Sequence, residues 1–278
     1  MGELRDIVGA MRSLAGLRMQ EAQRALPGVR RYSASTAAAV GAALRLIAQP
    51  VPEPPRSGRR ALILCLAEHG FVGAFNDRLL QGAEAVMPAA DPLLVLGSRG
   101  AGLACEGGRK VSWSHPMATR LAGVPDTVNH LSGELYRRLA PGEIVSVEVM
   151  FSRYRPGATG SIERQRLLPP DTAALAAAPA AEAPLHNLEP TQLFEKLLSE
   201  YVFARLTEAA AESIVSENAA RFAAMESAHD NVTKKLTELQ QGAQQERQSD
   251  ITAELLDLMI GAGALSGTPG SWSLRLGR

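Results

Sequence analysis

The fold is decided by the stretch from residue 191 to about residue 260, which reads TQLFEKLLSEYVFARLTEAAAESIVSENAARFAAMESAHDNVTKKLTELQQGAQQERQSDITAELLDLMI. It contains no proline, and Gly242 is its only glycine among strong helix formers. Turn and capping residues precede it from Asn187 to Thr191, and Glu195 lies near the first turn, where a carboxylate suits the helix dipole. We therefore predict one continuous helix.

Apolar residues in this helix recur every three or four positions, which is the narrow stripe of a coiled-coil seam. They are Met225, Ala228, Val232, Leu236, Leu239 and Ala243. Such a stripe needs a partner helix, and the N-terminal segment repeats the spacing at Leu4, Ile7, Met11 and Leu14, with the polar Arg18 at the next position. Pro27 and Gly28 should kink or interrupt this arm. We predict that residues 3–48 and 191–262 pack as an extended antiparallel pair.

A middle domain begins after a proline-rich stretch at residues 49–55 that no helix can cross. Short, continuously apolar runs at 61–67 and 92–97 are typical of strands buried on both faces. Further strands are expected at 110–114, 144–151 and 161–168, and helices near 77–87 and 127–139. The alternation predicts a compact, Rossmann-like α/β unit, so the fold class is α/β with a coiled coil of the terminal helices.

Composition excludes several classes of protein. Lys and Arg total 29 and are balanced by 29 Asp and Glu, so no global basic field exists to bind nucleic acid. The two cysteines, Cys65 and Cys105, cannot build a disulfide framework, which fits a reducing, cytoplasmic setting. No stretch approaches the roughly 20 apolar residues of a membrane-spanning helix, and the N-terminus lacks the layout of a signal peptide. We expect a protein that is neither exported nor membrane-spanning.

Candidate sites for chemistry are few. The glycine-rich stretch Gly97-Ser-Arg-Gly-Ala-Gly102 follows a predicted strand, but it has neither the full dinucleotide fingerprint nor a Walker lysine, so a structural role is favoured. His69 beside Glu68 fits a glycine-permitted turn better than acid–base chemistry. The five histidines show no metal-ligand spacing. We expect no catalytic residue, no metal, no cofactor and no nucleotide bound by the middle domain.

The most informative segment is residues 240–250, QQGAQQERQSD, where the long helix turns almost wholly polar before an apolar pattern resumes at Ile251. The simple interpretation is a solvated helix face. The alternative is a surface that meets a partner through hydrogen bonds and slides past it.

At these residues the chain resembles the gamma subunit of rotary F-type ATP synthases. Residues 247–255, RQSDITAEL, followed by GAGAL at 261–265, are similar to the family's C-terminal signature, and SENAARFAAM at 216–225 through Asp230 and Asn231 is similar to its other helical signature. Near the start, Ala10-Met11, Leu14-Ala15 and Arg18-Met19 resemble a third motif. In the middle, Gly70-Phe-Val-Gly73 with Asn76 resembles a Gly-Leu-Cys-Gly-x-x-Asn turn, with Val72 in place of the cysteine.

The resemblance implies a non-catalytic rotor shaft, the central stalk, which couples ion flow through a membrane ring to ATP synthesis or hydrolysis on a catalytic hexamer. The implied partners are the alpha and beta subunits of the hexamer, the epsilon subunit and the membrane c-ring, with no nucleic acid and no direct small-molecule ligand. The location would be the cytoplasmic face of a bacterial inner membrane, as a peripheral subunit. The implied subunit-interface residues are Met11, Arg18, Met19, Met225, Asp230, Asn231, Arg247, Gln248, Ile251 and Thr252.

The domains expected on this basis are the N-terminal coiled-coil helix at 1–50, the central α/β domain at 59–168, a linker at 169–190, the C-terminal coiled-coil helix at 191–265 and a tail at 266–278. The chain departs from the family in a shorter N-terminal helix and in this added tail, which contains Pro269 and Trp272 and should not be helical. Two alternatives stay open: a stand-alone α/β nucleotide-binding enzyme whose helical arms mediate oligomerisation, with its site near Gly97, and a coiled-coil scaffold without a rotary partner.

Overall fold

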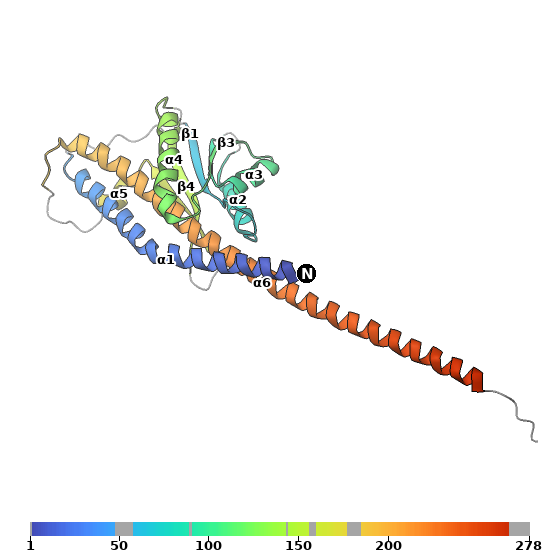
Figure 1. Ribbon diagram of the computed structural model, residues 1–278. Coiled ribbons are helices and arrows are strands. Elements are labelled where there is room, and N and C mark those ends of the chain that lie inside the picture. Colours follow the sequence, from blue (N-terminus) through green and yellow to red (C-terminus); the bar gives the residue numbers. More distant parts are fainter. Residues whose placement is uncertain are drawn as a thin grey trace, which may run out of the picture. The chain divides into compact units, whose positions relative to one another are not determined.

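Two long helices dominate the computed structural model, which describes residues 2–47, 58–88, 91–142, 144–155, 160–176 and 185–266. Helix α1 spans Gly2–Leu44 and helix α6 spans Pro190–Ser266, so the predicted long C-terminal helix is confirmed. Of the two outcomes expected at Pro27 and Gly28, a kink or an interruption, the interruption does not occur, because α1 continues through Pro27; the helix bends along its length (Figure 1). Of the expected tail, residues 267–278 lie outside the described residues.

A five-stranded sheet lies between the two helices in the sequence. The strands are β1 (Arg59–Cys65), β2 (Leu93–Leu96), β3 (Val111–His115), β4 (Ile144–Arg153) and β5 (Ser161–Leu168). The helices are α2 (Phe75–Val86), α3 (Ser98–Glu106), the short 3-10 helix η1 (Leu121–Gly123), α4 (Val124–Leu139) and α5 (Thr172–Ala176). All five predicted strands and both predicted helices are confirmed, whereas α3 and α5 were not anticipated as helices.

The strand order is β3-β2-β1-β4-β5, with β1 to β4 parallel and β5 antiparallel to β4. The chain moves outward from β1 through β2 to β3, then returns across the sheet by α4 to place β4 on the other side of β1. This reversal is the topological switch point of a doubly wound sheet. It lies between β1 and β4.

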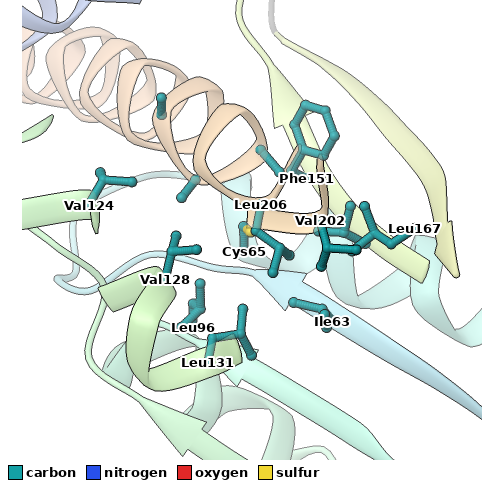
Figure 2. Close-up of a cluster of buried hydrophobic side chains, with 14 of the residues drawn as sticks. Ile63, Cys65, Leu96, Val124, Val128, Leu131, Phe151, Leu167, Val202 and Leu206 are labelled. Carbon is teal, nitrogen blue, oxygen red and sulfur yellow. The ribbon is translucent and has the colours of Figure 1, made fainter. Parts of the chain in front are cut away.

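Both faces of the sheet are buried, which explains the continuously apolar strands. Ile63 and Cys65 of β1 point to the face covered by α4 and α6, and Figure 2 shows them packed with Val128, Leu131 and Leu206. On the opposite face, alternate residues of β1 and β2 pack with α2 and α3; they are Leu62, Leu64, Leu93 and Val95. The sheet is thus the centre of a three-layer α/β/α unit.

Helices α1 and α6 pack against each other in an antiparallel direction within the compact unit Val8–Glu226. Their contacts pair low numbers in α1 with high numbers in α6: Gly16 lies against Phe222, Arg30 bonds to Glu212, and Tyr32 bonds to Glu200. Figure 1 shows α1 alongside the first part of α6. The predicted antiparallel helix pair is confirmed over this region.

The contact face of α1 differs from the predicted one. Leu4, Ile7 and Leu14 are 46 to 58% exposed. The buried positions are instead Val8, Ala15, Ala22 and Leu26. This buried stripe mixes alanines with larger residues. Val8 and Ala15 each follow a residue of the predicted stripe by one position, so the buried face is rotated about the helix axis from the predicted one.

The other end of the predicted seam is also different. Ala228, Val232 and Leu236 in α6 are half-buried, but Leu239 is 51% exposed and every side chain from residue 243 to residue 259 is exposed. The apolar residues there are Ile251, Leu255, Leu256, Leu258 and Met259. Pairing of the N-terminal arm with residues 243–259, as predicted, is therefore not seen in the described residues.

Candidate functional site

The carboxyl edge of the parallel strands is where doubly wound proteins bind ligands, at the switch point. In this chain α6 lies across that point. The Ser213 hydroxyl donates a hydrogen bond of 2.8 Å to the carbonyl of Cys65 at the end of β1, and the Ser216 hydroxyl donates one of 2.8 Å to the carbonyl of Ser152 in β4. The helix thus occupies the crevice that a nucleotide would need.

The N-terminus of α3 is occupied as well. One carboxylate oxygen of Glu68 accepts hydrogen bonds from the backbone N–H groups of Ser98, at 2.9 Å, and Met117, at 2.7 Å. Gly97 has φ of 109°, and a Cβ there would lie 2.4 Å from the carbonyl oxygen of Leu66. Gly97 is therefore required for close packing, and a protein carboxylate fills the position that a phosphate would take.

The turn after β1 is held by α6. Phe71, at φ of 61°, and Gly73, at φ of 54°, adopt the left-handed conformation, and the buried Asn76 accepts a 2.9 Å hydrogen bond from the backbone of Ala67. Arg221 donates hydrogen bonds of 3.2 Å to the carbonyls of His69 and Gly70. Phe71 is 65% exposed, and its positive φ is unusual for a bulky residue.

A buried polar cluster lies where α6 meets this turn and α1. Burial raises the pKa of Glu217, although the guanidinium of Arg221, at 2.6 Å, favours its charged form. Arg18 of α1 lines the same small cavity, together with Glu68 and Asn218. Its Nε is buried and has no hydrogen-bond partner in the described part of the chain.

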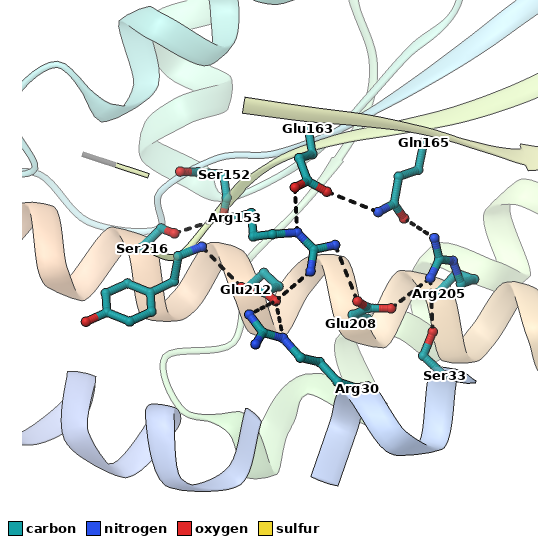
Figure 3. Close-up of polar contacts among 11 residues, drawn as sticks. Arg30, Ser33, Ser152, Arg153, Glu163, Gln165, Arg205, Glu208, Glu212 and Ser216 are labelled. Carbon is teal, nitrogen blue, oxygen red and sulfur yellow. Dashed lines mark hydrogen bonds and ion pairs between the residues drawn. The ribbon is translucent and has the colours of Figure 1, made fainter. Parts of the chain in front are cut away.

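A second polar network joins α1, α6 and the sheet (Figure 3). The fully buried carboxylate of Glu212 accepts hydrogen bonds from Arg30 at 2.7 Å, from Arg153 at 3.3 Å and from the backbone of Tyr154 at 3.1 Å. Arg153 also pairs with Glu163 at 2.6 Å and with Glu208 at 3.5 Å. This network leaves one signal in the sequence, which is the pair Glu208 and Glu212, four residues apart in an otherwise apolar stretch of helix.

The structure places the predicted interface residues in two groups. Met11, Arg18 and Met19 in α1 are half-buried, and Met225 in α6 is 5% exposed. Met19 lines a mostly apolar cleft of about 650 Å³ with Val72, Tyr154 and Phe222. The exposed residues all lie in α6 beyond that cleft: Asp230, Asn231, Arg247, Gln248, Ile251 and Thr252. The Thr252 hydroxyl bonds back to the Gln248 carbonyl at 2.8 Å.

Groups that could perform chemistry are sparse. Burial raises the pKa of the Cys65 thiol to about 12, so this cysteine is chemically quiet. No group of three or more potential ligands that could hold a metal ion occurs among the residues described. Within the same ranges, no helix is both long and apolar enough to cross a membrane.

Comparison with known sequences gives a consistent result. The model of the ATP synthase family matches residues 1–265. The chain is 25% identical to the ATP synthase gamma chain of Geotalea uraniireducens (strain Rf4) over 285 aligned positions, covering 95% of this chain and 94% of that one. It is 27% identical to the ATP synthase gamma chain of Clavibacter michiganensis subsp. michiganensis, covering 94% and 93% of the two chains.

Solved structures show the same fold. A chain of the Tetrahymena thermophila mitochondrial ATP synthase central stalk and c-ring is similar with a TM-score of 0.57 and 17% identity, over 80% of this chain and 99% of that one. A chain from the Euglena gracilis mitochondrial ATP synthase is similar with a TM-score of 0.56 and 14% identity, over 96% and 100%. Since the family model covers nearly the whole sequence, the chain belongs to the ATP synthase gamma-chain family.

Proposed function

We propose that this chain is the central-stalk rotor subunit of an F-type ATP synthase, which couples ion flow through a membrane ring to ATP synthesis or hydrolysis on a catalytic hexamer. The angle of the rotor biases which conformation each catalytic subunit adopts. The chain itself performs no chemistry, and ATP turnover stays on its partners.

The observation that carries this proposal is the exposure of residues 243–259 in α6. This stretch of helix leaves large apolar side chains uncovered: Ile251, Leu255, Leu256, Leu258 and Met259. A contiguous exposed apolar face of this kind marks a site of protein–protein interaction. The alpha and beta subunits, whose hexamer encloses the stalk in the family, supply that cover.

The carboxyl edge of the sheet supports the same function over a stand-alone nucleotide-binding enzyme. Ser213 and Ser216 seat α6 across the switch point, and Glu68 fills the N-terminus of α3. The chain's own side chains therefore occupy the crevice and the helix N-terminus at which an enzyme of this fold would bind a nucleotide.

The proposal divides the chain by role. The helices at 1–50 and 191–265 form the shaft, the domain at 59–168 forms the foot, and residues 169–190 connect the two. The foot meets the epsilon subunit and the membrane c-ring. The subunit lies at the cytoplasmic face of a bacterial inner membrane, held there by its partners.

Capture of the catalytic hexamer tests the proposal. The tagged chain, co-expressed with alpha and beta subunits from the same organism, should co-purify with them at one copy per three alpha–beta pairs. Replacing Leu255→Asp and Leu258→Asp puts charge on the exposed apolar face and should abolish capture. The matched control, Gln192→Asp with Ser199→Asp, adds the same charge at exposed polar positions near the start of α6, outside residues 243–259, and should retain capture. A wild-type chain that folds but captures neither subunit would refute the rotor function.

A further inference from the structure

A cleft of about 660 Å³ lies at the opposite edge of the sheet from the nucleotide-binding edge. Its walls come from the first residues of the parallel strands and the last turn of α4: Arg59, Asp91, Pro92, Lys110, Val111, Ser112, Glu134, Arg137, Arg138, Pro141 and Ile144. The volume is within the range of small-ligand pockets. The family signatures use none of these residues, and neither do the interface residues that the resemblance implies.

Cations outnumber acids in this cleft. Arg59, Lys110, Arg137 and Arg138 face two carboxylates. One of these, Asp91, accepts a 3.3 Å hydrogen bond from the backbone of Arg60 and is 3.8 Å from its guanidinium, which lies outside the lining. The cleft therefore has a net positive charge.

The second carboxylate, that of Glu134, holds two of the guanidinium groups in place. Glu134 is almost fully buried and pairs with both Arg137 and Arg138. Arg138 also donates a 2.9 Å hydrogen bond to the carbonyl of Ser112, which fixes its plane. A guanidinium has five N–H donors, so each keeps donors for a further acceptor. Lys110 is exposed and has no ion pair or hydrogen bond in the described ranges of the chain.

We propose that this cleft binds a phosphate-bearing anion, either a small soluble phosphate compound or the headgroup of an anionic phospholipid. Guanidinium forks bind phosphate oxygens in pairs, and a lysine adds a mobile point charge, so the set suits a compact polyanion. A concave site with ordered donors favours such an anion over an extended acidic peptide, which needs an open surface. This proposal departs from the sequence-based expectation of no direct small-molecule ligand, because the cleft is formed by residues far apart in the sequence that share no motif.

The test uses the purified full chain and two probes. Calorimetry with pyrophosphate measures the soluble source, and flotation with vesicles containing an anionic phospholipid, against vesicles of neutral phosphatidylcholine, measures the lipid source. The variant Lys110→Ala with Arg137→Ala removes two exposed cations and leaves Arg138 to pair with Glu134. The control Arg31→Ala with Lys234→Ala removes one arginine and one lysine from exposed positions elsewhere.

We expect saturable binding to at least one probe, weakened roughly 10- to 100-fold in the cleft variant and unchanged in the control. Binding of pyrophosphate alone assigns the site to a soluble phosphate, and binding of anionic vesicles alone assigns it to a headgroup. Binding to neither probe, or equal loss in the control, overturns the proposal. If the double variant unfolds, Lys110→Ala alone serves, because this side chain makes no hydrogen bond or ion pair with the residues that the structure describes. None of these readouts depends on hexamer capture, so the rotor function stands or falls separately.

Discussion

Arg30 of α1 donates a 2.7 Å hydrogen bond from its Nε to the carboxylate of Glu212 in α6, a side chain with no exposed surface. The same carboxylate accepts hydrogen bonds from Arg153 and from the backbone of Tyr154, at the end of β4. One buried charge therefore ties together both long helices and the sheet. Because the carboxylate is removed from water, its partners determine whether its burial is tolerated at all.

Replacing Glu212→Ala should lower the free energy of unfolding by roughly 1–3 kcal/mol, since the N–H of Tyr154 and one guanidinium donor of Arg153 lose their acceptor while Arg153 keeps Glu163 and Glu208. Urea unfolding followed by circular dichroism measures the change. Glu200→Ala is the matched control: Glu200 also joins α6 to α1, through Tyr32, but it is exposed, so the change should stay within about 0.5 kcal/mol. Equal effects of the two substitutions would show that burial of Glu212 is unimportant.

Glu68 should stabilise the N-terminus of α3 about as much as an N-cap residue does. Glu68→Ala removes the acceptor for the N–H groups of Ser98 and Met117 and should cost about 1–2 kcal/mol of stability. Hydrogen exchange should speed up at these two amides before it does in the strands. Retained protection at Ser98 would mean that another group caps α3.

Much of the fold could be predicted from the sequence because burial on both faces leaves a strong local pattern. The apolar runs of β1 and β2 and the proline-free length of α6 each specify one kind of element. The seam of α1 could not be placed, because its buried positions at Ala15 and Ala22 have little hydropathy, whereas the exposed Leu4, Ile7 and Leu14 have a great deal. Exposure of large residues there reflects partners outside the chain under the proposed function.

The polar sites are harder to predict from the sequence than the helices and strands are. Glycines at 97–102 were correctly given a structural role, but the group that caps α3, Glu68, lies 30 residues earlier in the chain. The basic cleft draws on the starts of four strands and the end of α4. Residues brought together only by sheet topology leave no motif, so spacing could not reveal them.

Glu134 should make stability depend on pH in the acid range. Burial pushes its pKa upward, but hydrogen bonds and charge from Arg137 and Arg138 outweigh this, so its pKa in the folded state lies below the usual value. The resulting stabilisation is present above the unfolded-state pKa of about 4.3 and is lost as the pH falls through the folded-state pKa. Glu134→Gln should therefore be destabilising at pH 7, with a smaller difference from wild type at pH 3.

Chemical unfolding at the two pH values measures this difference. Glu106→Gln is the control, since that carboxylate is 63% exposed and pairs with Arg99 at 3.6 Å; it should change stability little at either pH. A Glu134→Gln difference that grows on acidification would contradict the assigned sign.

The two thiols should differ sharply in reactivity. Cys105 is exposed, whereas burial raises the pKa of Cys65 to about 12. A thiol reagent such as DTNB should titrate one cysteine quickly in the native chain and the second only after denaturant is added. The variant Cys105→Ser should then show no fast phase. Fast labelling of that variant would mean that the sheet opens readily around β1.

Arg247 and Gln248 provide the sharpest test of rotor function within the long helix. Both side chains are exposed, as are all their neighbours from residue 243 to residue 259. Replacing both with Ala should leave the isolated chain's stability within about 0.5 kcal/mol, because exposed helix positions tolerate Ala well. In the assembled complex, a guanidinium can pair with a partner's carboxylate through two parallel hydrogen bonds, so assembly or coupled ATP turnover should fall.

The control removes the same chemical groups where no partner is expected. Gln192→Ala with Lys196→Ala also deletes one amide and one positive charge from exposed positions of α6, near its start. Because net charge and helix content change equally in the two variants, a loss of turnover confined to Arg247→Ala with Gln248→Ala must come from a local contact. If Arg247→Ala with Gln248→Ala unfolds the free chain, the two residues belong to its core. If assembly and turnover of this variant are normal, the contact contributes nothing to coupling.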